Sequence, residues 1–497
     1  MALVENPGDA LEATGSELPG GAPRAATSDN LITLPLPFLA SVVFSGFMVA
    51  AFSEEPVVLI SAIILVWFMG GMQVHWDPLH PYTIFGTGML LYAIAAPLLA
   101  QFDLFPRPLY QAAKALQILY LSFVVVYLAS WPSRLSSAAL SNLSADEFTI
   151  GARVVIAIAL PLCAISVFYP AVSGFTTKQE IVVSGGVLSR LSYFSALNLG
   201  FSFLIYSAIQ KNRIATLWST ILPLAAFYVL TIGLVGQRYG FYYLGITTLI
   251  LFAALRQIKL THLVILGLTA LGLNTLLGGL KLFISASLGG DDILESTFAF
   301  YGTDDFNYWL AYEDFISRSF KTALLALLGS EPTTVADNLN TLVDLVPDTY
   351  PYSYGGAIVS DLERAFSLGF LQETGSGIGT ATQNSSILFN SWVQLEGFLE
   401  GSGIGFCLIC TGYLDLGVTG ALIISLLLGL ALRFAYRAST KSVIGLIFYA
   451  NLIPVVMTSL RQDVSQIIST PLKQLVIPLF IVSMSALLAR SQADKTN

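Results

Sequence analysis

The chain has 497 residues, of which 55% are hydrophobic and 11% are charged, and its mean hydropathy is +0.74. An ordinary soluble domain carries about 25% charged residues, so the composition excludes that class and predicts an all-α polytopic membrane protein. The net charge of −8 is divided between two aqueous compartments and therefore does not describe one surface. No basic patch suggests nucleic-acid binding.

The residues 1–30 are polar and rich in Gly, Pro and Ala, and we expect a disordered cytoplasmic tail. They contain no apolar core preceded by basic residues, so no signal peptide is predicted. Because a spanning helix needs about 20 mostly apolar residues, the rest of the chain predicts about twelve spans. Nine form a bundle over 31–286 and three lie in 416–490, followed by a short tail, 491–497. The spans are expected near 32–52, 57–73, 82–100, 110–130, 152–170, 190–209, 215–236, 240–255, 261–285, 416–436, 442–459 and 472–490.

Basic residues in short connections set the orientation of the spans. Lysines and arginines gather in 210–214, 256–260, 433–441 and the C-terminal tail. If these segments are cytoplasmic, they alternate correctly with the spans. We therefore expect a multi-pass membrane protein with both termini in the cytoplasm.

The segment 287–415 falls on the exported side in this topology. It holds seventeen acidic residues and three basic ones, and it contains an aromatic cluster at 298–315. We expect a folded extracytoplasmic loop region with amphipathic helices at the membrane surface.

An arginine, Arg238, interrupts the apolar sequence in GLVGQRYGFYY (233–243), at the exported end of an expected span. A snorkelling side chain at a helix end is one interpretation. A functional site is the other, since an ionisable residue at membrane depth often marks one. Positive charge is scarce on the exported side, which favours a local anionic ligand.

Three stretches carry a resemblance to a known family: Gly236-Gln237-Arg238, VPDTYPYSYGG (346–356) and GSGIGFCLICTGYLDLGVTGALIISLLLGL (401–430). With the many spans and the late exported loop, they resemble the Wzy-type polymerases of O-antigen and capsule repeat units. Arg364 and Gly375 add an R-x10-G spacing described in exported loops of some of these enzymes. The chain departs from the family at Cys410-Thr411-Gly412, where an acidic residue is expected.

The resemblance implies a glycosyltransferase C-like fold that uses no metal and no cofactor. It implies a place in the bacterial inner membrane and two undecaprenyl-pyrophosphate-linked oligosaccharides as substrates. A hydroxyl of one substrate would attack the anomeric carbon of the other. Arginines bind pyrophosphate bidentately, a carboxylate can take the hydroxyl proton, and tyrosines can stack on sugars. Arg238, Arg364 and Arg461 are expected to bind the pyrophosphate. Asp463, Asp361 and Glu363 are the candidate proton acceptors. The tyrosines expected to contact the sugars are Tyr350, Tyr352, Tyr354 and Tyr413.

Structural alternatives stay open for several of these residues. Arg461 could pair with Asp463, and Arg364 with Asp361 one helical turn away. The tyrosines Tyr350, Tyr352 and Tyr354 also suit an interfacial turn. For CLIC (407–410) packing is favoured over zinc or redox chemistry, and for VHWDPLHP (74–81) a structural turn is favoured over a metal site.

Three other functions compete with polymerisation. An O-antigen ligase is expected to use a histidine in its exported loop, and no histidine occurs between 263 and 497. A lipid-linked oligosaccharide flippase fits twelve spans, but the two halves of this chain do not match. A membrane scaffold is the third alternative. Whether a flippase or a chain-length regulator binds the protein is open.

Overall fold

The computed structural model describes residues 36–77, 79–101, 112–131, 145–172, 193–211, 219, 221–234, 239–255, 331–366, 385–393 and 406–458, with short pieces between 460 and 487. Within these residues every regular element is a helix. The expected all-α class is therefore confirmed.

The helices of the first half are α1 (Leu36–Ala51), α2 (Pro56–Gln73), the π-helix η1 (Tyr82–Gly86), α3 (Thr87–Gln101), α4 (Ala112–Ser130), α5 (Ala145–Val172), α8 (Tyr193–Gln210), α10 (Leu222–Leu234) and α11 (Tyr239–Leu255). The second half contains α16 (Glu331–Leu345), α17 (Gly356–Phe366), α18 (Ser385–Val393), α19 (Leu408–Ser439) and α20 (Val443–Thr458).

Several of these helices can cross a membrane. Among the described residues, five are long and apolar enough: Pro56–Gln73, Tyr82–Ala100, Ala112–Ser130, Phe148–Ile165 and Leu408–Ser439. Shorter apolar helices accompany them at Leu36–Ala51, Ala196–Gln210, Tyr243–Leu255 and Val443–Met457. The chain is thus a polytopic membrane protein. The expected spans from 32–52 to 240–255, and those at 416–436 and 442–459, coincide with helices. The span 261–285 lies outside the described residues and 472–490 is described in part, so the number twelve stays a prediction.

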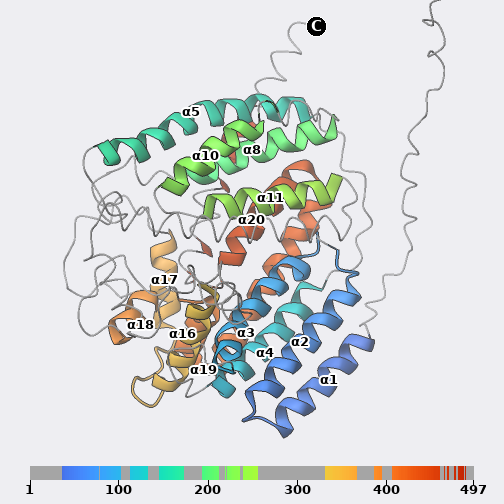
Figure 1. The fold of residues 1–497 in the computed structure, drawn as a ribbon, viewed down its shortest axis with the longest axis vertical. Coiled ribbons are helices and arrows are strands. Elements are labelled where there is room, and N and C mark those ends of the chain that lie inside the picture. Colours follow the sequence, from blue (N-terminus) through green and yellow to red (C-terminus); the bar gives the residue numbers. More distant parts are fainter. Residues whose placement is uncertain are drawn as a thin grey trace, which may run out of the picture.

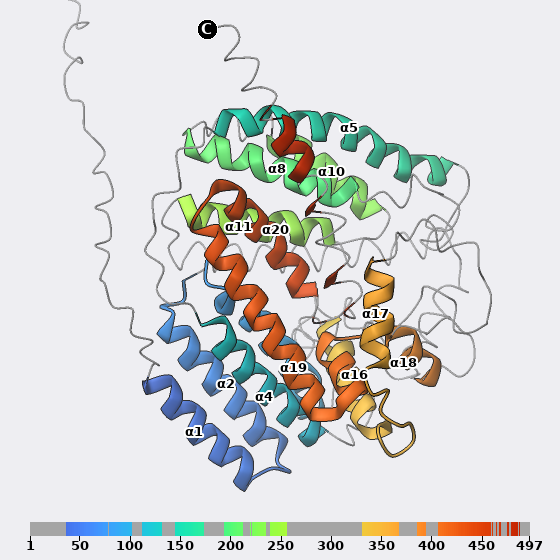
Figure 2. The ribbon, with the colours of Figure 1, turned by 180° about the vertical axis from the view of Figure 1, so that it is seen from behind.

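The helices form two neighbouring groups, and the short helices α16, α17 and α18 lie together at one end of the group that contains α19 (Figures 1 and 2). In one group α1 packs on α2, and α19 packs along α4. In the other α5 packs on α8, and α11 contacts both α8 and α20. Helices α16, α17 and α18 gather around the N-terminal end of α19, where α16 also packs on α3.

A buried polar network holds the second group together. The Asn198 amide donates to Asn451 Oδ1 (2.9 Å), and the Asn451 amide donates to Ser202 Oγ (3.0 Å). The hydroxyl of Thr247 donates to the carbonyl of Ala450 (3.1 Å). These bonds join α8, α11 and α20, and bonds of this kind between membrane helices contribute about 0.6–2 kcal/mol each.

Helix α19 is broken near its start. Leu416 (φ −137°, ψ 23°) and Gly417 (φ 61°, ψ −144°) leave the helical conformation, which turns the segment before them back onto the long part of the helix. There the backbones of Gly412 and Gly420 touch, and a Cβ atom on Gly412 would lie 2.5 Å from the Gly420 carbonyl oxygen. The expected span start at 416 coincides with this break, whereas the helix itself begins earlier, at Leu408. The other expected domain boundaries stay predictions.

Candidate functional site

Two of the stretches singled out in the sequence lie against each other. The N–H of Ser353 donates to the carbonyl of Leu414 (3.0 Å), and the N–H of Tyr354 donates to the carbonyl of Asp415 (3.1 Å). The tyrosine-rich segment 350–354 is therefore fixed to the glycine-rich start of α19. No local sequence signal predicts this pairing.

The side chain of Asp415 completes the attachment. This carboxylate is fully buried and accepts the N–H groups of Ala357 (3.0 Å) and Ile358 (2.9 Å), and the Ser353 hydroxyl also donates to it. The first N–H groups of a helix have no partner within the helix, and the helix dipole favours a negative charge beside them. Asp415 thus caps the N-terminus of α17 from another helix.

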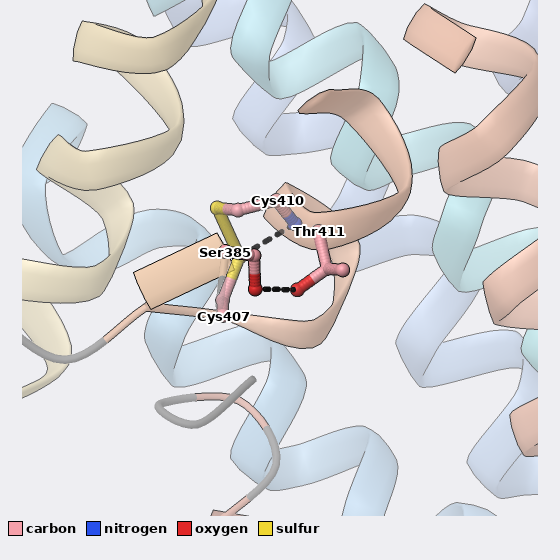
Figure 3. Close-up of a disulfide and its surroundings, with 4 residues drawn as sticks. All are labelled: Ser385, Cys407, Cys410 and Thr411. Atoms are coloured by element: carbon pink, nitrogen blue, oxygen red, sulfur yellow. Dashed lines mark hydrogen bonds between the residues drawn. A yellow bond between two sulfur atoms is a disulfide. The ribbon is translucent and has the colours of Figure 1, made fainter. Parts of the chain in front are cut away.

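A second buried carboxylate caps α18 in the same way. Asp361 on α17 accepts the N–H (3.0 Å) and the hydroxyl (2.7 Å) of Ser385, the first residue of α18. The Ser385 hydroxyl also lies 3.0 Å from that of Thr411 on α19 (Figure 3). We call Asp361, Ser385, Thr411 and Asp415 the capping junction, because these residues tie α17, α18 and α19 together.

A disulfide lies beside the capping junction. Cys407 and Cys410 are linked, with their Cα atoms 5.1 Å apart, and the Cys407 sulfur caps α19 by accepting the Cys410 N–H (3.1 Å) (Figure 3). Both cysteines are buried, as expected for a packing role of CLIC (407–410), but they are also covalently joined, which was not expected. Disulfides persist in oxidising compartments, which agrees with the exported placement expected from the sequence for this end of α19.

The four tyrosines expected to contact sugars have different surroundings. Tyr413 is 1% exposed, and its hydroxyl donates to the carbonyl of Val346 (3.2 Å). Tyr352 is half-buried with its ring edge-on to Tyr413, at a centroid distance of 6.2 Å. Tyr350 stacks flat on Trp392 of α18, with ring centroids 4.1 Å apart.

Tyr354 is the tyrosine most open to a ligand. Its side chain is 76% exposed, while its backbone takes the left-handed conformation (φ 49°) ahead of Gly355 (φ 93°). A turn with two such residues holds the ring outward from the junction. The interfacial-turn interpretation and the sugar-contact interpretation are thus compatible at this position.

Lys114, which the sequence analysis does not single out, lies close enough to act on Tyr352 electrostatically. Burial raises the pKa of Tyr352, Tyr413 raises it further, and Lys114 at the start of α4 opposes the shift. The hydroxyl of Tyr352 therefore stays protonated near neutral pH and can donate a hydrogen bond. Only the assembled fold brings Lys114, more than 200 residues away in the sequence, near this tyrosine.

The expected charged residues are only partly described. Arg238, Arg461 and Asp463 lie outside the described residues. Arg364 lies on α17, but its side chain is outside them. Glu363, on the same helix, has an exposed side chain, in contrast to the buried Asp361. The structure therefore brings the three tyrosines 350–354 and Tyr413 together with α17, and it leaves the arginine cluster untested.

Together these features define a polytopic membrane protein with a disulfide-braced, aromatic site at one end of its bundle. Residues 321–491 match the family model described as O-antigen polysaccharide polymerase Wzy, and this stretch contains the whole capping junction. About the last third of the chain is thus similar to a family whose description names an O-antigen polysaccharide polymerase. Comparison with curated proteins and with solved structures gave no match.

Proposed function

We propose that the protein joins undecaprenyl-pyrophosphate-linked repeat units at the exported face of the bacterial inner membrane. The observation that carries the proposal is the contact between the tyrosine-rich segment and the start of α19, inside the stretch that matches the family. This contact places exposed aromatic surface, half-buried hydroxyl groups and the charged helix α17 at one end of the membrane helices.

In the proposed reaction a sugar hydroxyl of one substrate attacks the anomeric carbon of the other. The bond from that carbon to the pyrophosphate oxygen breaks, and undecaprenyl pyrophosphate leaves. Arg238, Arg364 and Arg461 neutralise the leaving group, because a guanidinium binds two phosphate oxygens at once. The scheme requires neither a metal nor a cofactor.

The hydroxyl proton needs an acceptor within hydrogen-bond reach. Of the three candidate acids, Asp361 already accepts two hydrogen bonds from Ser385 in a fully buried position. We therefore assign Asp361 to holding α17 and α18, and Glu363 or Asp463 to proton transfer. Tyr354 and Tyr350 supply the surface on which a sugar ring stacks.

The test is deletion of the gene in its host, with the surface and secreted polysaccharide resolved by size. Loss of polymer with single repeat units still delivered to the surface is the expected result. Long polymer left on its lipid carrier would instead show a ligase, and lipid-linked units retained on the cytoplasmic side would show a transporter. Unchanged polysaccharide would contradict all three enzyme and transport assignments.

A further inference from the structure

The end of α19 remote from the capping junction carries two arginines on a lipid-facing strip. Leu426, Leu430 and Phe434 are 45%, 45% and 77% exposed along one side of this apolar helix. Arg433 and Arg437 follow on that side. At about 100° per residue, Arg437 lies within about 20° of Leu430 around the helix axis. The arginines therefore continue the surface that faces lipid.

The depth of these arginines matches that of lipid headgroups. At about 1.5 Å per residue, Arg433 and Arg437 lie about 24 and 30 Å beyond the break at Gly417. The hydrocarbon core of a bilayer is about 30 Å thick. When the break at Gly417 is placed at one surface of the membrane, the guanidinium groups of Arg433 and Arg437 reach the opposite surface.

A buried histidine adjoins the same corner. His80 is 4% exposed, and its ring lies 5.5 Å from that of Tyr436, one helical turn from Arg433. Its Nδ1 accepts the N–H of Tyr82 (3.1 Å), and burial lowers the pKa of His80 to about 3. The ring is therefore neutral, and its one proton is on Nε2, which is a donor.

Two donors in this corner are buried without an acceptor in the described part of the chain: Nε2 of His80 and Nε of Arg433. A buried donor that lacks an acceptor costs about 1–3 kcal/mol, so a site of this kind favours an acceptor ligand. The fixed charges agree with an anion. The two arginines, Arg433 and Arg437, outnumber Asp77, whose carboxylate also accepts the N–H of Leu79 (2.9 Å).

We propose that this corner binds the phosphate of an anionic membrane phospholipid, held by Arg433 and Arg437, with its acyl chains along Leu430 and Phe434. A lipid is favoured over a free phosphate ion because the arginines share a face with exposed apolar side chains. The proposal is independent of the polymerase assignment, since the two sites lie at opposite ends of α19.

The test is native mass spectrometry of the purified full-length protein with phosphatidylglycerol or phosphatidylcholine added in turn. We expect wild type to retain phosphatidylglycerol preferentially. Arg433→Gln should lower that retention roughly fivefold, the effect of one basic residue near an anionic lipid surface. The matched control is Lys441→Gln, which removes the same charge at an exposed position next to the site and should retain lipid as wild type does.

Each other outcome overturns the proposal. Equal retention of the two lipids by wild type would show that no anionic headgroup site exists. Equal loss in Arg433→Gln and Lys441→Gln would show a diffuse charge effect. Displacement of the lipid by millimolar inorganic phosphate would show a site for the free ion. If Arg433→Gln does not fold, Arg433→Lys keeps the charge without the guanidinium fork and should still show weakened retention.

Discussion

The carboxylate of Asp415 and the N–H of Ile358 lie 2.9 Å apart, although 57 residues separate them in the sequence. This bond attaches α17, which carries Asp361, Glu363 and Arg364, to the first turns of α19. The orientation of the helix that carries Glu363 and Arg364, both proposed to act in the site, therefore depends on Asp415.

Replacement of Asp415 should impair both stability and polymerisation. Asp415→Ala leaves the N–H groups of Ala357 and Ile358 buried without an acceptor, which should lower the free energy of unfolding by about 2–4 kcal/mol. Asp415→Asn keeps one acceptor oxygen and should lie between wild type and alanine. Thermal unfolding in detergent and polymer length in cells measure the two effects. Asp344→Asn, an exposed carboxylate on α16, is the control, and an Asp415→Asn variant with wild-type values would refute the capping role.

Replacement of Gly420 should open the fold-back at the start of α19. A Cβ atom at Gly420 would collide with the carbonyl oxygen of Gly412, and neither backbone can move away cheaply. Gly420→Ala should destabilise the protein by about 1–3 kcal/mol, the usual cost of overpacking. Gly245→Ala on α11 makes the same change where no atom lies within 4 Å. If both variants unfold at the same temperature, the close approach is not significant.

Replacement of Tyr354 should affect polymerisation without affecting stability. Its ring is 76% exposed, so removal costs little packing, while a lost aromatic contact weakens ligand binding by about 2- to 10-fold. Tyr354→Ala should give shorter polymer at an unchanged unfolding temperature. Tyr354→Phe keeps the ring and should polymerise normally. Normal polymer from the alanine variant would remove Tyr354 from the sugar surface.

Replacement of Asn451 tests the buried network of the second helix group. Asn451→Leu removes the partner of both Asn198 and Ser202 and should lower stability by about 1–3 kcal/mol. The unfolding temperature of the purified protein is the measurement. Ser61→Ala is the control, because the Ser61 hydroxyl donates to the carbonyl of Val57 in its own exposed helical turn (2.8 Å). Equal stability of the two variants would show that the network contributes nothing.

Replacement of Arg238 or Arg461 tests the proposed pyrophosphate contacts. Arg238→Ala and Arg461→Ala should each abolish long polymer while single repeat units still reach the surface, and the lysine variants should recover part of the activity. Polysaccharide sizing at matched protein levels is the measurement, and Arg153→Ala on the exposed side of α5 is the control. Wild-type polymer from both alanine variants would show that the assignment is wrong.

Hydropathy alone predicts most of the helices, because membrane helices need long apolar sequence and the chain supplies it from α1 onward. In the sequence, the break at Leu416 and Gly417 is marked only by the expected start of a span at residue 416. The earlier start of α19 at Leu408 was missed, because it depends on contacts with Gly420 and with the segment near Ser353. Those contacts are long-range, and a local pattern does not contain them.

The sequence singles out the tyrosines that the fold brings together, but it does not show which residues hold them in place. For Asp361 the sequence suggests a base or a partner of Arg364, because both alternatives are local. In the structure Asp361 accepts two hydrogen bonds from Ser385, 24 residues later. Asp415 stood in the motif between Tyr413 and Gly417, and its position there was the one available signal. No sequence signal points to Lys114, because it lies near Tyr352 only through the packing of α4 in the folded protein.

The bond between Asn198 and Asn451 also constrains how the protein is made. These residues are 253 positions apart, so α8 enters the bilayer long before its partner helix α20 has been synthesised. During that interval the Asn198 amide must stay near water or find a temporary acceptor in a neighbouring helix. Closure of the second helix group is consequently a late event in biogenesis, and a chain that ends before α20 cannot reach it.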